Sequence, residues 1–419
     1  MSGHDVSLLS LHYPPDSTGV APYSGALAAG LAARGHRVAA YVAHPFYPEW
    51  RIRAGYGQWR RTENVDGVVV RRFLHYVPRP PRGVRRLLSE ISFGLRLAFG
   101  GSAAHSVVIA VSPALFATAL VALRIGMRRS RPTFIVWVQD LYALGMTETK
   151  EGGGLSAKIA ELVERVTLRR ADRVVVIHPR FARYLVEELG IDPERVAVIR
   201  NWTHLAPSAP MSRSEARAVL GWRYDVRLVV HTGNMGAKQG LDNVVAAARL
   251  ADERRLPVEF VLVGDGGERA RLEELARGVE RIRFVDPLDD TRYRCALAAA
   301  DCLLVNELPG VAAMAVPSKL TSYFDAGRPI VAATDLGGIT AEEVSRSGAG
   351  IAVPAGDPEA LLATALRLSD DHDGALVHGA AGQRYRREVL TEEAAITAFD
   401  QVIRDAVARG SAASRTRVA

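Results

Sequence analysis

The chain has 419 residues, 48% of them apolar and 24% charged, which is enough for two folded domains of roughly 150–200 residues each. Its net charge of +7 does not by itself indicate nucleic-acid binding, because the arginines are scattered and no aromatic–basic alternation accompanies them. Cys295 and Cys302 lie in apolar sequence, are too few for a disulfide framework, and are expected to be reduced and structural.

The first residues, MSGHDVSLLSLHY, read as a short strand that meets Pro14-Pro15, without the cationic and apolar regions of a secretion signal, so a cytoplasmic location is expected. The longest uncharged run, Ser106 to Leu123, falls just short of the ~20 residues that a membrane span needs and is divided by Ser112-Pro113. A buried strand, a turn and a buried helix are favoured there over a span.

Short apolar segments alternate with helix-length segments through the first half of the chain. The apolar segments are DVSLLSL, RVAAYVA, SVVIAVS, TFIVWVQD and DRVVVIH, and a helix is expected around PYSGALAAGLAARGH. This alternation is typical of a parallel sheet with helices on both faces. We therefore predict a first, doubly wound α/β domain over residues 1–203.

A Pro- and Ser-rich stretch near 203–214 predicts a linker, after which the alternation restarts. The second set of strands is expected in VRLVVHTG, VEFVLVGDG, IRFVDPL, DCLLVNE, PIVAAT and GIAVPA. These segments predict a second Rossmann-like domain over 204–390, facing the first across a cleft, with ligands beyond the carboxyl ends of the strands. Residues 391–419 are expected to form a helix near Glu392–Arg409 that returns to the first domain, followed by a disordered tail.

Lysine is rare in this chain: among 53 basic residues only Lys150, Lys158, Lys238 and Lys319 are lysine. Lys238 lies in LVVHTGNMGAKQGLDNVVAAARL, which runs from an apolar strand through a loop with three glycines into an Ala-rich helix. Glycines let backbone N–H groups face a ligand, and a helix start favours an anion. Lys238 would add a compact charge suited to a phosphate oxygen. An ordinary turn with a solvated lysine explains this segment alone equally well.

Lys319 lies in a second loop of the same kind, VPSKLTSYFDAGRPIV. Pro317 and Ser318 predict a helix start, and Gly327 predicts its end. A lysine in a first helical turn is unfavourable unless it has an anionic partner, so the two lysine-bearing loops together favour phosphate binding. Ser318, Ser322 and Asp325 would share one face of this helix and line the same site, or form a solvated face.

Three further stretches end predicted strands with glycine or acidic residues. VLVGDGGERARLEEL matches half a dinucleotide fingerprint and would place Gly264 beside the ligand. In LHYPPDSTGVAPYSGAL, the loop would bring Gly19 to a diphosphate and Asp16 to an attacking hydroxyl; alternatively it is a rigid connection with Asp16 as a turn residue. Asp140, after TFIVWVQ, would face the cleft or cap the next helix. The sequence contains no H-E-x-x-H, paired C-x-x-C, G-x-S-x-G or Walker motif, so no metal site is predicted.

With these segments the sequence resembles the GT-B-fold, retaining glycosyltransferases of family four, in the branch of colanic-acid fucosyltransferases and related exopolysaccharide enzymes. The resemblance is carried by YPPDSTGVAPYSGALAAGLAARGHRV, FYPEWRIRAGYGQWRR, VQDLY, RVAVIRNWTH, TGNMGAKQGLDNVV, LVGDGGERARLE and VPSKLTSYFDAGRPIV, which cover nearly the whole chain.

The resemblance implies a nucleotide diphosphate sugar as co-substrate and no metal. The diphosphate would meet Gly19, the Gly233–Gly240 loop and the Ser318-Lys319 helix start, and the base would meet Asp286, Pro287 and Leu288. Many relatives have Arg and Lys where this chain has Asn234 and Gln239, and the cation moves to Lys238. Ser322 stands roughly where relatives bind ribose with glutamate, and Gln139-Asp140 replaces their histidine. The residues implied for the donor are Gly19, Gly233, Asn234, Lys238, Gln239, Gly240, Gly264, Asp286, Leu288, Pro317, Ser318, Lys319 and Ser322, and those implied for catalysis are Asp16, Asp140, Lys238 and Lys319.

In retaining transfer of this type the leaving diphosphate deprotonates the incoming nucleophile, so catalysis depends on charge stabilisation and positioning. The donor would carry GDP or UDP. The acceptor is either a lipid-linked glycan precursor, reached through a weak peripheral membrane contact of the basic amphipathic segment 78–100, or a soluble metabolite with an oxygen or sulfur nucleophile. A non-hydrolysing nucleotide-sugar epimerase on the same fold and a nucleic-acid binder are the alternatives.

Overall fold

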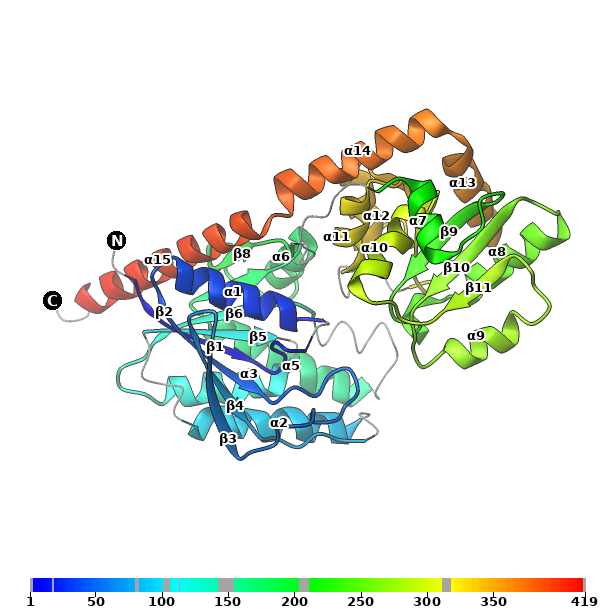
Figure 1. Cartoon of the computed structure of the whole chain (residues 1–419). Helices are drawn as coiled ribbons and strands as arrows, with labels where there is room; N and C mark the ends of the chain where they lie inside the picture. The colour runs from blue at the N-terminus through cyan, green and yellow to red at the C-terminus, as the bar shows by residue number, and fades with distance from the viewer. Residues whose placement is uncertain are drawn as a thin grey trace. The chain divides into compact units, whose positions relative to one another are not determined.

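The computed structural model describes residues 3–16, 19–79, 83–100, 106–112, 114–141, 154–202, 211–310 and 318–416. Within these ranges the chain forms two α/β units, each drawn in Figure 1 with its own sheet. The first unit consists of Met1–His204 with Glu392–Ala419, and the second of Leu205–Thr391. Each unit has its own sheet and its own buried core.

The sheet of the first unit has eight strands in the order β3-β4-β2-β1-β5-β6-β7-β8. Their bounds are β1 Asp5–Ser10, β2 Arg37–Ala43, β3 Arg60–Val65, β4 Val68–Phe73, β5 Val107–Ser112, β6 Thr133–Val138, β7 Arg173–Val176 and β8 Val196–Val198. All neighbours are parallel except β3 and β4.

The antiparallel edge strand β3 departs from the all-parallel sheet that the sequence pattern predicts. Asp66 and Gly67 both have positive φ, 51° and 76°, which gives the tight two-residue connection that joins antiparallel neighbours. The strand itself, RRTENV, is mostly exposed. It therefore lacks the run of apolar residues by which the buried parallel strands can be recognised in the sequence.

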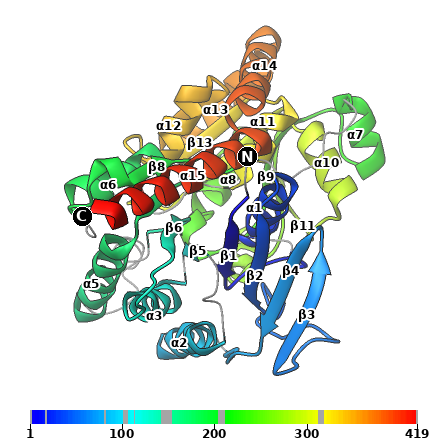
Figure 2. The ribbon, with the colours of Figure 1, turned by 90° about the vertical axis from the view of Figure 1, so that its left-hand side faces the viewer.

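Helices cover both faces of this sheet (Figure 2). They are α1 Ala21–Ala33, α2 Val84–Phe99, α3 Leu115–Gly126, α5 Gly154–Arg170, α6 Pro179–Glu187 and α15 Glu392–Thr416. On one face, α1 and α15 share a core that includes Leu27 and Phe399. On the other, Phe93 and Leu97 of α2 meet Leu9 of β1. Within the segment 106–123, the described residues form β5 and most of α3, as predicted.

The last helix is longer than its sequence suggests. A return to the first unit is confirmed, because Ile396, Phe399 and Ile403 of α15 lie in the core beside α1. The helix was expected to end near Arg409 before a disordered tail, and this is wrong: α15 continues to Thr416. A single Gly410 among Ala, Ser and Arg residues costs only about 1 kcal/mol and does not stop a helix that is already formed.

The sheet of the second unit has six strands, all parallel, in the order β11-β10-β9-β12-β13-β14. Their bounds are β9 Arg227–Thr232, β10 Val258–Val263, β11 Ile282–Val285, β12 Cys302–Asn306, β13 Ile330–Thr334 and β14 Gly350–Pro354. Every strand comes from a segment in which the sequence predicts one. Strands β9, β10, β12 and β13 are buried and mostly apolar, whereas β11 and β14 at the edges are largely half-buried.

The helices of the second unit also divide between two faces of the sheet. They are α7 Arg213–Leu220, α8 Asp242–Glu253, α9 Arg269–Leu275, α10 Asp290–Ala299, α11 Lys319–Ala326, α12 Ile339–Ser347, α13 Pro358–Asp370 and α14 His372–Val389. One core is built with α7, α10, α11, α12 and α14, and the other with α8, α9 and α13. The carboxyl ends of the six parallel strands therefore lie along one edge, where ligands of such sheets bind.

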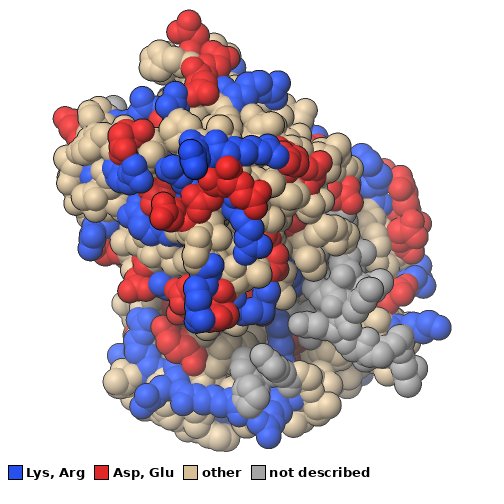
Figure 3. All heavy atoms as spheres, turned by 90° about the vertical axis from the view of Figure 1, so that its right-hand side faces the viewer, with Lys and Arg blue, Asp and Glu red and all other residues tan. Residues whose placement is uncertain are grey.

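The charge pattern of the surface agrees with the scatter of arginines in the sequence. On the face shown in Figure 3, basic and acidic side chains are interspersed over most of the area. Cys295 and Cys302 are both free and buried, as predicted. Among the helices of the described ranges, none combines the length and the apolar character that crossing a membrane requires.

Candidate functional site

The loop after β9 packs directly against the loop after β10. The N–H groups of Gly233 and Met235 donate to the carbonyl oxygens of Val263 and Asp265, each at 2.8 Å. A Cβ atom on Gly264 would overlap the carbonyl oxygen of Gly233. Gly233 and Gly264 also have φ values of 109° and 138°, a region that side chains strongly disfavour. Glycine is therefore required at 264 by the close approach of the two loops, and at 233 by the backbone conformation.

This packing corrects one part of the sequence interpretation, in which glycine N–H groups face a ligand. The N–H of Gly233 is used between the loops, and the N–H of Gly236 is bound at 3.1 Å by the side-chain oxygen of Gln239. Gln239, expected at the donor, thus helps to shape the loop itself. The neighbouring loop and Gln239 thus provide hydrogen-bond partners for these N–H groups within the protein.

Asn306 fixes the far end of the glycine loop, and the sequence analysis did not identify it. Its side-chain amide, buried at the end of β12, donates to the carbonyl oxygens of Gln239 and Gly240 at 2.8 and 2.9 Å. Asn243 of α8 in turn donates to the Asn306 oxygen at 2.9 Å. A signal was present in the sequence, since Asn306 ends the otherwise apolar strand CLLVN.

Lys238 lies in the short 3-10 turn η2, Ala237–Gln239, and its side chain is exposed. Its carbonyl oxygen accepts a hydrogen bond from the N–H of Leu308 at 2.8 Å. Asn234 is also exposed, and Gly240 ends the turn with a φ of 53°. The loop main chain is therefore anchored to the segment after β12, while Lys238 and Asn234 are directed to the surface.

Lys319 is the first residue of α11, and its amine lies beside the glycine loop. A Cβ atom on Gly233 would lie 3.8 Å from Cε and 3.9 Å from Nζ of Lys319. The same amine is 3.1 Å from Nε2 of His231, a buried residue of β9. Burial lowers the pKa of Lys319 from its ordinary value to about 7, although the nearby charge of Glu307 opposes that change. The structure thus brings two of the sequence-predicted loops together.

The start and end of α11 agree with the sequence prediction. Ser318 is the N-cap residue, it is exposed, and the helix ends at Gly327 with a φ of 64°. Pro317 lies outside the described residues. Asp325, predicted to share the site with Ser318, forms an ion pair with Arg386 of α14 at 3.1 Å. It therefore stabilises the packing of two helices, and its carboxylate is already engaged.

Two tyrosine hydroxyls gather around the end of β9 in the same region. The hydroxyl of Tyr323 accepts from the N–H of Thr232 at 2.9 Å and donates to the carbonyl of Leu304 at 3.3 Å. Tyr293 of α10 contacts the Thr232 hydroxyl at 3.4 Å and also bonds Ser322. Burial raises the pKa of Tyr293, so it is a neutral hydroxyl. Ser322, expected to bind ribose, is buried within this group.

The loop after β11 is tied to the loop after β10 by Arg269. Its guanidinium binds the carboxylate of Asp286 at 2.7 Å and donates to the carbonyl oxygen of Gly264 at 2.9 Å. Asp286 is exposed, and Leu288 is half-buried against the core. The residues expected at the base therefore belong to a loop whose position relative to Gly264 is fixed by one arginine, a contact that the sequence analysis did not predict.

In the first unit, Asp16 follows β1 and is buried. Burial raises the pKa of its carboxyl to about 6, although backbone N–H groups of Phe46 and Tyr47 oppose the change. Within the described part of the chain, its Oδ1 atom has no hydrogen-bond partner. Asp140, after β6, is half-buried. Burial raises the pKa of the Tyr47 hydroxyl, and the charges of Asp140 and Asp16 add to that effect, against Arg86. Gly19 has a φ of 63° just before α1.

Gln139 precedes Asp140 and was expected to face the cleft. Its side chain is buried and exchanges two hydrogen bonds with Asn201, at 3.2 and 2.8 Å. The amide therefore has its partner within the first unit and links the ends of β6 and β8.

Two family models match the chain in the order of its units. The one described as glycosyl transferase 4-like domain matches residues 18–202, and the one described as glycosyl transferases group 1 matches residues 226–371. Among curated proteins, the colanic acid biosynthesis glycosyl transferase WcaI of Escherichia coli strain K12 is 30% identical over 423 residues, 95% of this chain and 99% of that protein. D-inositol 3-phosphate glycosyltransferase 1 of Catenulispora acidiphila is 29% identical over 76% of this chain and 78% of its own length.

Solved structures with the same fold include sucrose-phosphate synthase of Thermosynechococcus elongatus, with a TM-score of 0.75 at 20% identity over 97% of this chain and 100% of that one. HepE of Anabaena in complex with UDP-glucose has a TM-score of 0.68 at 16% identity over 95% and 99%. The two Rossmann-like units show the GT-B fold, and the family matches show that the protein is a glycosyltransferase. The chain belongs to glycosyltransferase family four, in the branch of the colanic-acid and exopolysaccharide enzymes.

Proposed function

We propose that the protein transfers a hexose-type or modified sugar from a nucleotide diphosphate sugar, with GDP or UDP as the nucleotide, and that the diphosphate binds at the carboxyl edge of the second sheet. The observation that supports this most is the Lys319 amine beside Gly233, where a strand end, a glycine loop and a helix start meet. Lys238 and Ser318, both exposed at this edge, would add a second cation and a hydroxyl.

The transfer is proposed to proceed with retention and without a metal ion. Negative charge develops on the diphosphate as the sugar leaves, and the first turn of α11 and the two lysines are suited to stabilise it. The diphosphate itself would then take the proton of the attacking group. The base would lie at the Asp286–Leu288 loop, which Arg269 holds in place.

The acceptor is proposed to bind on the first unit, near Asp16 and Asp140. Asp16 follows β1 and Asp140 follows β6. Burial raises the pKa of the Tyr47 hydroxyl most, and the charges of both carboxylates add to that effect, which supports one shared polar region. Asp16 is suited to a hydroxyl ligand, because its Oδ1 atom has no partner among the described residues.

A panel of GDP, UDP, dTDP and ADP in a thermal-shift experiment tests the donor proposal. One of them should raise the unfolding temperature of the wild type, and Lys319→Ala should remove that shift and lower turnover by about 10²-fold, the size seen when one charge-stabilising donor is removed. Lys158→Ala, an exposed lysine of α5 in the other unit, is the matched control. Wild-type kinetics in Lys319→Ala would exclude Lys319 from the site.

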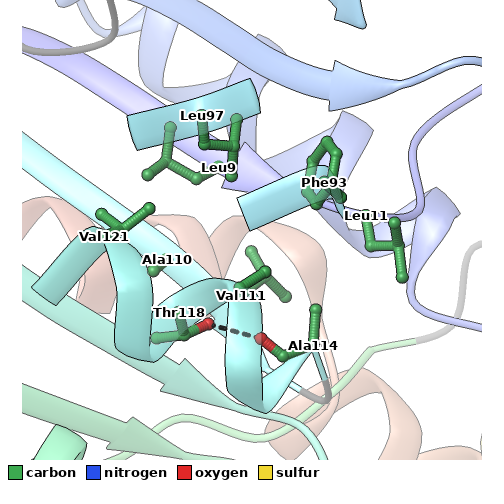
Figure 4. Close-up of a pocket in the computed structure, with 10 residues that line it drawn as sticks. Leu9, Leu11, Phe93, Leu97, Ala110, Val111, Ala114, Thr118 and Val121 are labelled. Carbon is green, nitrogen blue, oxygen red and sulfur yellow. Dashed lines mark hydrogen bonds between the residues drawn. The ribbon is translucent and has the colours of Figure 1, made fainter. Parts of the chain in front are cut away.

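For the acceptor we propose a lipid-linked glycan precursor, reached by docking of α2 on an anionic lipid surface. Phe93 and Leu97 of α2 point inward, toward a small apolar pocket of about 10 Å³ against β1, β5 and α3 (Figure 4). Val84, Leu88, Leu95 and Phe99 are 70%, 49%, 44% and 81% exposed, with the spacing of one helix face.

Basic residues accompany this outer face of α2. Arg85 and Arg86 are exposed in its first turn, and the guanidinium of Arg96 stacks on the exposed Trp59 ring at 3.6 Å. An apolar stripe flanked by arginine and tryptophan is the composition of helices that lie in a membrane interface and bind anionic headgroups. The charge complementarity favours anionic lipid over a neutral surface.

Vesicle co-sedimentation tests this docking surface. The wild type should bind vesicles with phosphatidylglycerol more than vesicles of phosphatidylcholine alone, and Leu88→Asp with Phe99→Asp should reduce that binding about tenfold or more. Leu376→Asp with Val377→Asp, on the exposed face of α14, controls for loss of apolar surface. If the α2 variant binds as the wild type does, or if no vesicle is bound, a soluble acceptor is favoured instead.

A further inference from the structure

His231 is a buried histidine in a central strand of the second sheet, next to the proposed diphosphate site. It follows Leu228, Val229 and Val230 in β9, and this strand lies between β10 and β12. A polar ring in such a position is costly unless its nitrogens find partners. Nδ1 lies 3.2 Å from the carbonyl oxygen of Leu304, and Nε2 lies 3.1 Å from Nζ of Lys319.

The partners determine which nitrogen carries the proton. A carbonyl oxygen only accepts hydrogen bonds, so Nδ1 is the donor toward Leu304. Nε2 of the neutral ring is then an acceptor, and the Lys319 amine donates to it. His231 therefore orients the amine without carrying a charge of its own. The contact between His231 and Lys319 is therefore a hydrogen bond to a neutral ring. A carboxylate in the place of His231 would instead form an ion pair with the amine.

The charged and titratable groups around the amine come from several elements. Glu307, after β12, is the acidic group that acts on Lys319, and its carboxylate accepts from the hydroxyls of Thr334 and Thr340. Tyr293 of α10 and Tyr323 of α11 are neutral, because burial raises the pKa of both. The pKa of His231 lies well below its ordinary value, because of burial first and Lys319 second, against backbone groups of Leu304 and Asn234.

We propose, on the basis of the proposed function, that His231 is a positioning residue that holds the Lys319 amine beside the glycine loop. The amine then takes up a proton when the anionic diphosphate of the donor binds. Among the residues that the structure describes, Glu307 is the acidic group that acts on the amine, so an arriving anion would be a further stabilising partner. Donor affinity therefore falls as the pH rises above neutrality, because binding then requires a proton from solution.

Titration calorimetry with UDP-glucose and GDP-mannose tests this, since neither phosphate of a nucleotide sugar titrates between pH 6 and 8. The nucleotide sugar that binds should take up about one proton at pH 8 and almost none at pH 6, as a group with a pKa near 7 requires. Buffers of different ionisation enthalpy give the proton number. Lys319→Arg, which stays charged, should bind with no uptake and little dependence on pH.

Variants of His231 separate positioning from folding. His231→Leu should weaken binding at pH 7 by about tenfold or more, and His231→Gln, which offers the amine an oxygen acceptor, should recover most of that loss. Thermal unfolding of each variant measures the effect on the fold. Binding by the wild type without proton uptake at pH 8, or unchanged affinity in His231→Leu, overturns the inference and leaves the proposed function intact.

Chemical labelling of lysines in the protein without any nucleotide is a second experiment, and it does not depend on donor binding. The chain has only four lysines, so mass spectrometry can follow Lys319 directly, with the exposed Lys238 as the reference. Labelling of Lys319 should rise with a midpoint near pH 7, and His231→Leu should change its rate and midpoint. A pH profile unaffected by His231→Leu contradicts the positioning role. If neither nucleotide sugar binds, the proposed function fails, and the coupling of proton uptake to donor binding fails with it.

Discussion

Individual residues at the edge of the second sheet owe their importance to partners far away in the sequence. His231 meets groups 73 and 88 positions away, and Asn306 meets the glycine loop 67 positions back. Lys319 was predicted from the sequence because lysine is rare here and stands at a helix start. His231 and Asn306 were not, because a single polar residue at a strand end does not indicate what it will face.

Gly264 is the residue at which steric demand is greatest, and this gives a prediction. Gly264→Ala should destabilise the second unit by about 2–4 kcal/mol, because the new Cβ would overlap the Gly233 carbonyl and the residue would keep a φ of 138°. Nucleotide binding should weaken with it. Denaturant unfolding and a nucleotide titration measure the two effects.

Gly278→Ala is the matched control for that prediction. Gly278 has a φ of 79°, but a Cβ there would meet nothing within 4 Å. The Gly278→Ala substitution should therefore lower the free energy of unfolding by only about 1 kcal/mol, because it adds backbone strain without a steric overlap. Equal losses in the two variants would show that the packing of the two loops adds nothing.

Elements of the first unit place several titratable groups in the interior, with pKa shifts of opposite sign. His75, after β4, lies between Phe46 and Phe93, with ring centroids 5.0 and 5.7 Å away. Burial first, and the nearby His12 and His44 second, lower its pKa to about 3. Glu90 of α2 accepts from the N–H of Phe116 at the start of α3, and burial raises its pKa to about 7.

Acid should destabilise the first unit through His75. Between pH 6.5 and about 3 the unfolded chain binds a proton at this histidine and the folded protein does not, so its contribution to stability falls as the pH falls. Relative to the wild type, His75→Phe should therefore gain about 2 kcal/mol between pH 7 and pH 5. Urea unfolding at the two pH values measures the difference, and a constant difference would contradict it.

The stability of Glu90→Gln relative to the wild type should depend on pH in the opposite direction to that of His75→Phe. The folded pKa is raised above the unfolded value of 4.5, so the stability associated with the protonated carboxyl is present at low pH and is lost as the pH rises through about 7. The free energy of unfolding of the glutamine variant, relative to that of the wild type, should thus be higher at pH 8 than at pH 5. The reverse order would mean that the Glu90 carboxylate is stabilised at the start of α3 more than burial opposes it.

At the level of the whole molecule, the chain closes the first unit with its last helix. Phe399 of α15 is fully buried, with its ring centroid 4.9 Å from that of Trp137 in β6. A Cβ on Gly30 of α1 would overlap Ile396, so α1 and α15 approach closely. Residues separated by the whole second unit therefore share one core.

Phe399→Ala should lower the stability of the first unit by about 3–5 kcal/mol, the usual cost of removing a buried aromatic ring. The second unit has separate cores, so its binding of a nucleotide should persist. Scanning calorimetry with and without the nucleotide distinguishes the two units. Leu376→Ala, an exposed position on α14, is the control, and equal destabilisation by both substitutions would contradict this assignment.

The two Rossmann-like units, eleven of their parallel strands, the limits of α11 and the glycosyltransferase class could be predicted from the sequence. Buried parallel strands are continuous apolar runs, and loop motifs are local. The antiparallel pairing of β3 and the extension of α15 to Thr416 became clear only from the folded structure. The same is true of the ion pair between Asp325 and Arg386 and of the hydrogen bonds between Gln139 and Asn201. Such partners depend on which strand ends lie side by side, and that is set by the packing of the sheet, over distances at which the sequence carries no local signal.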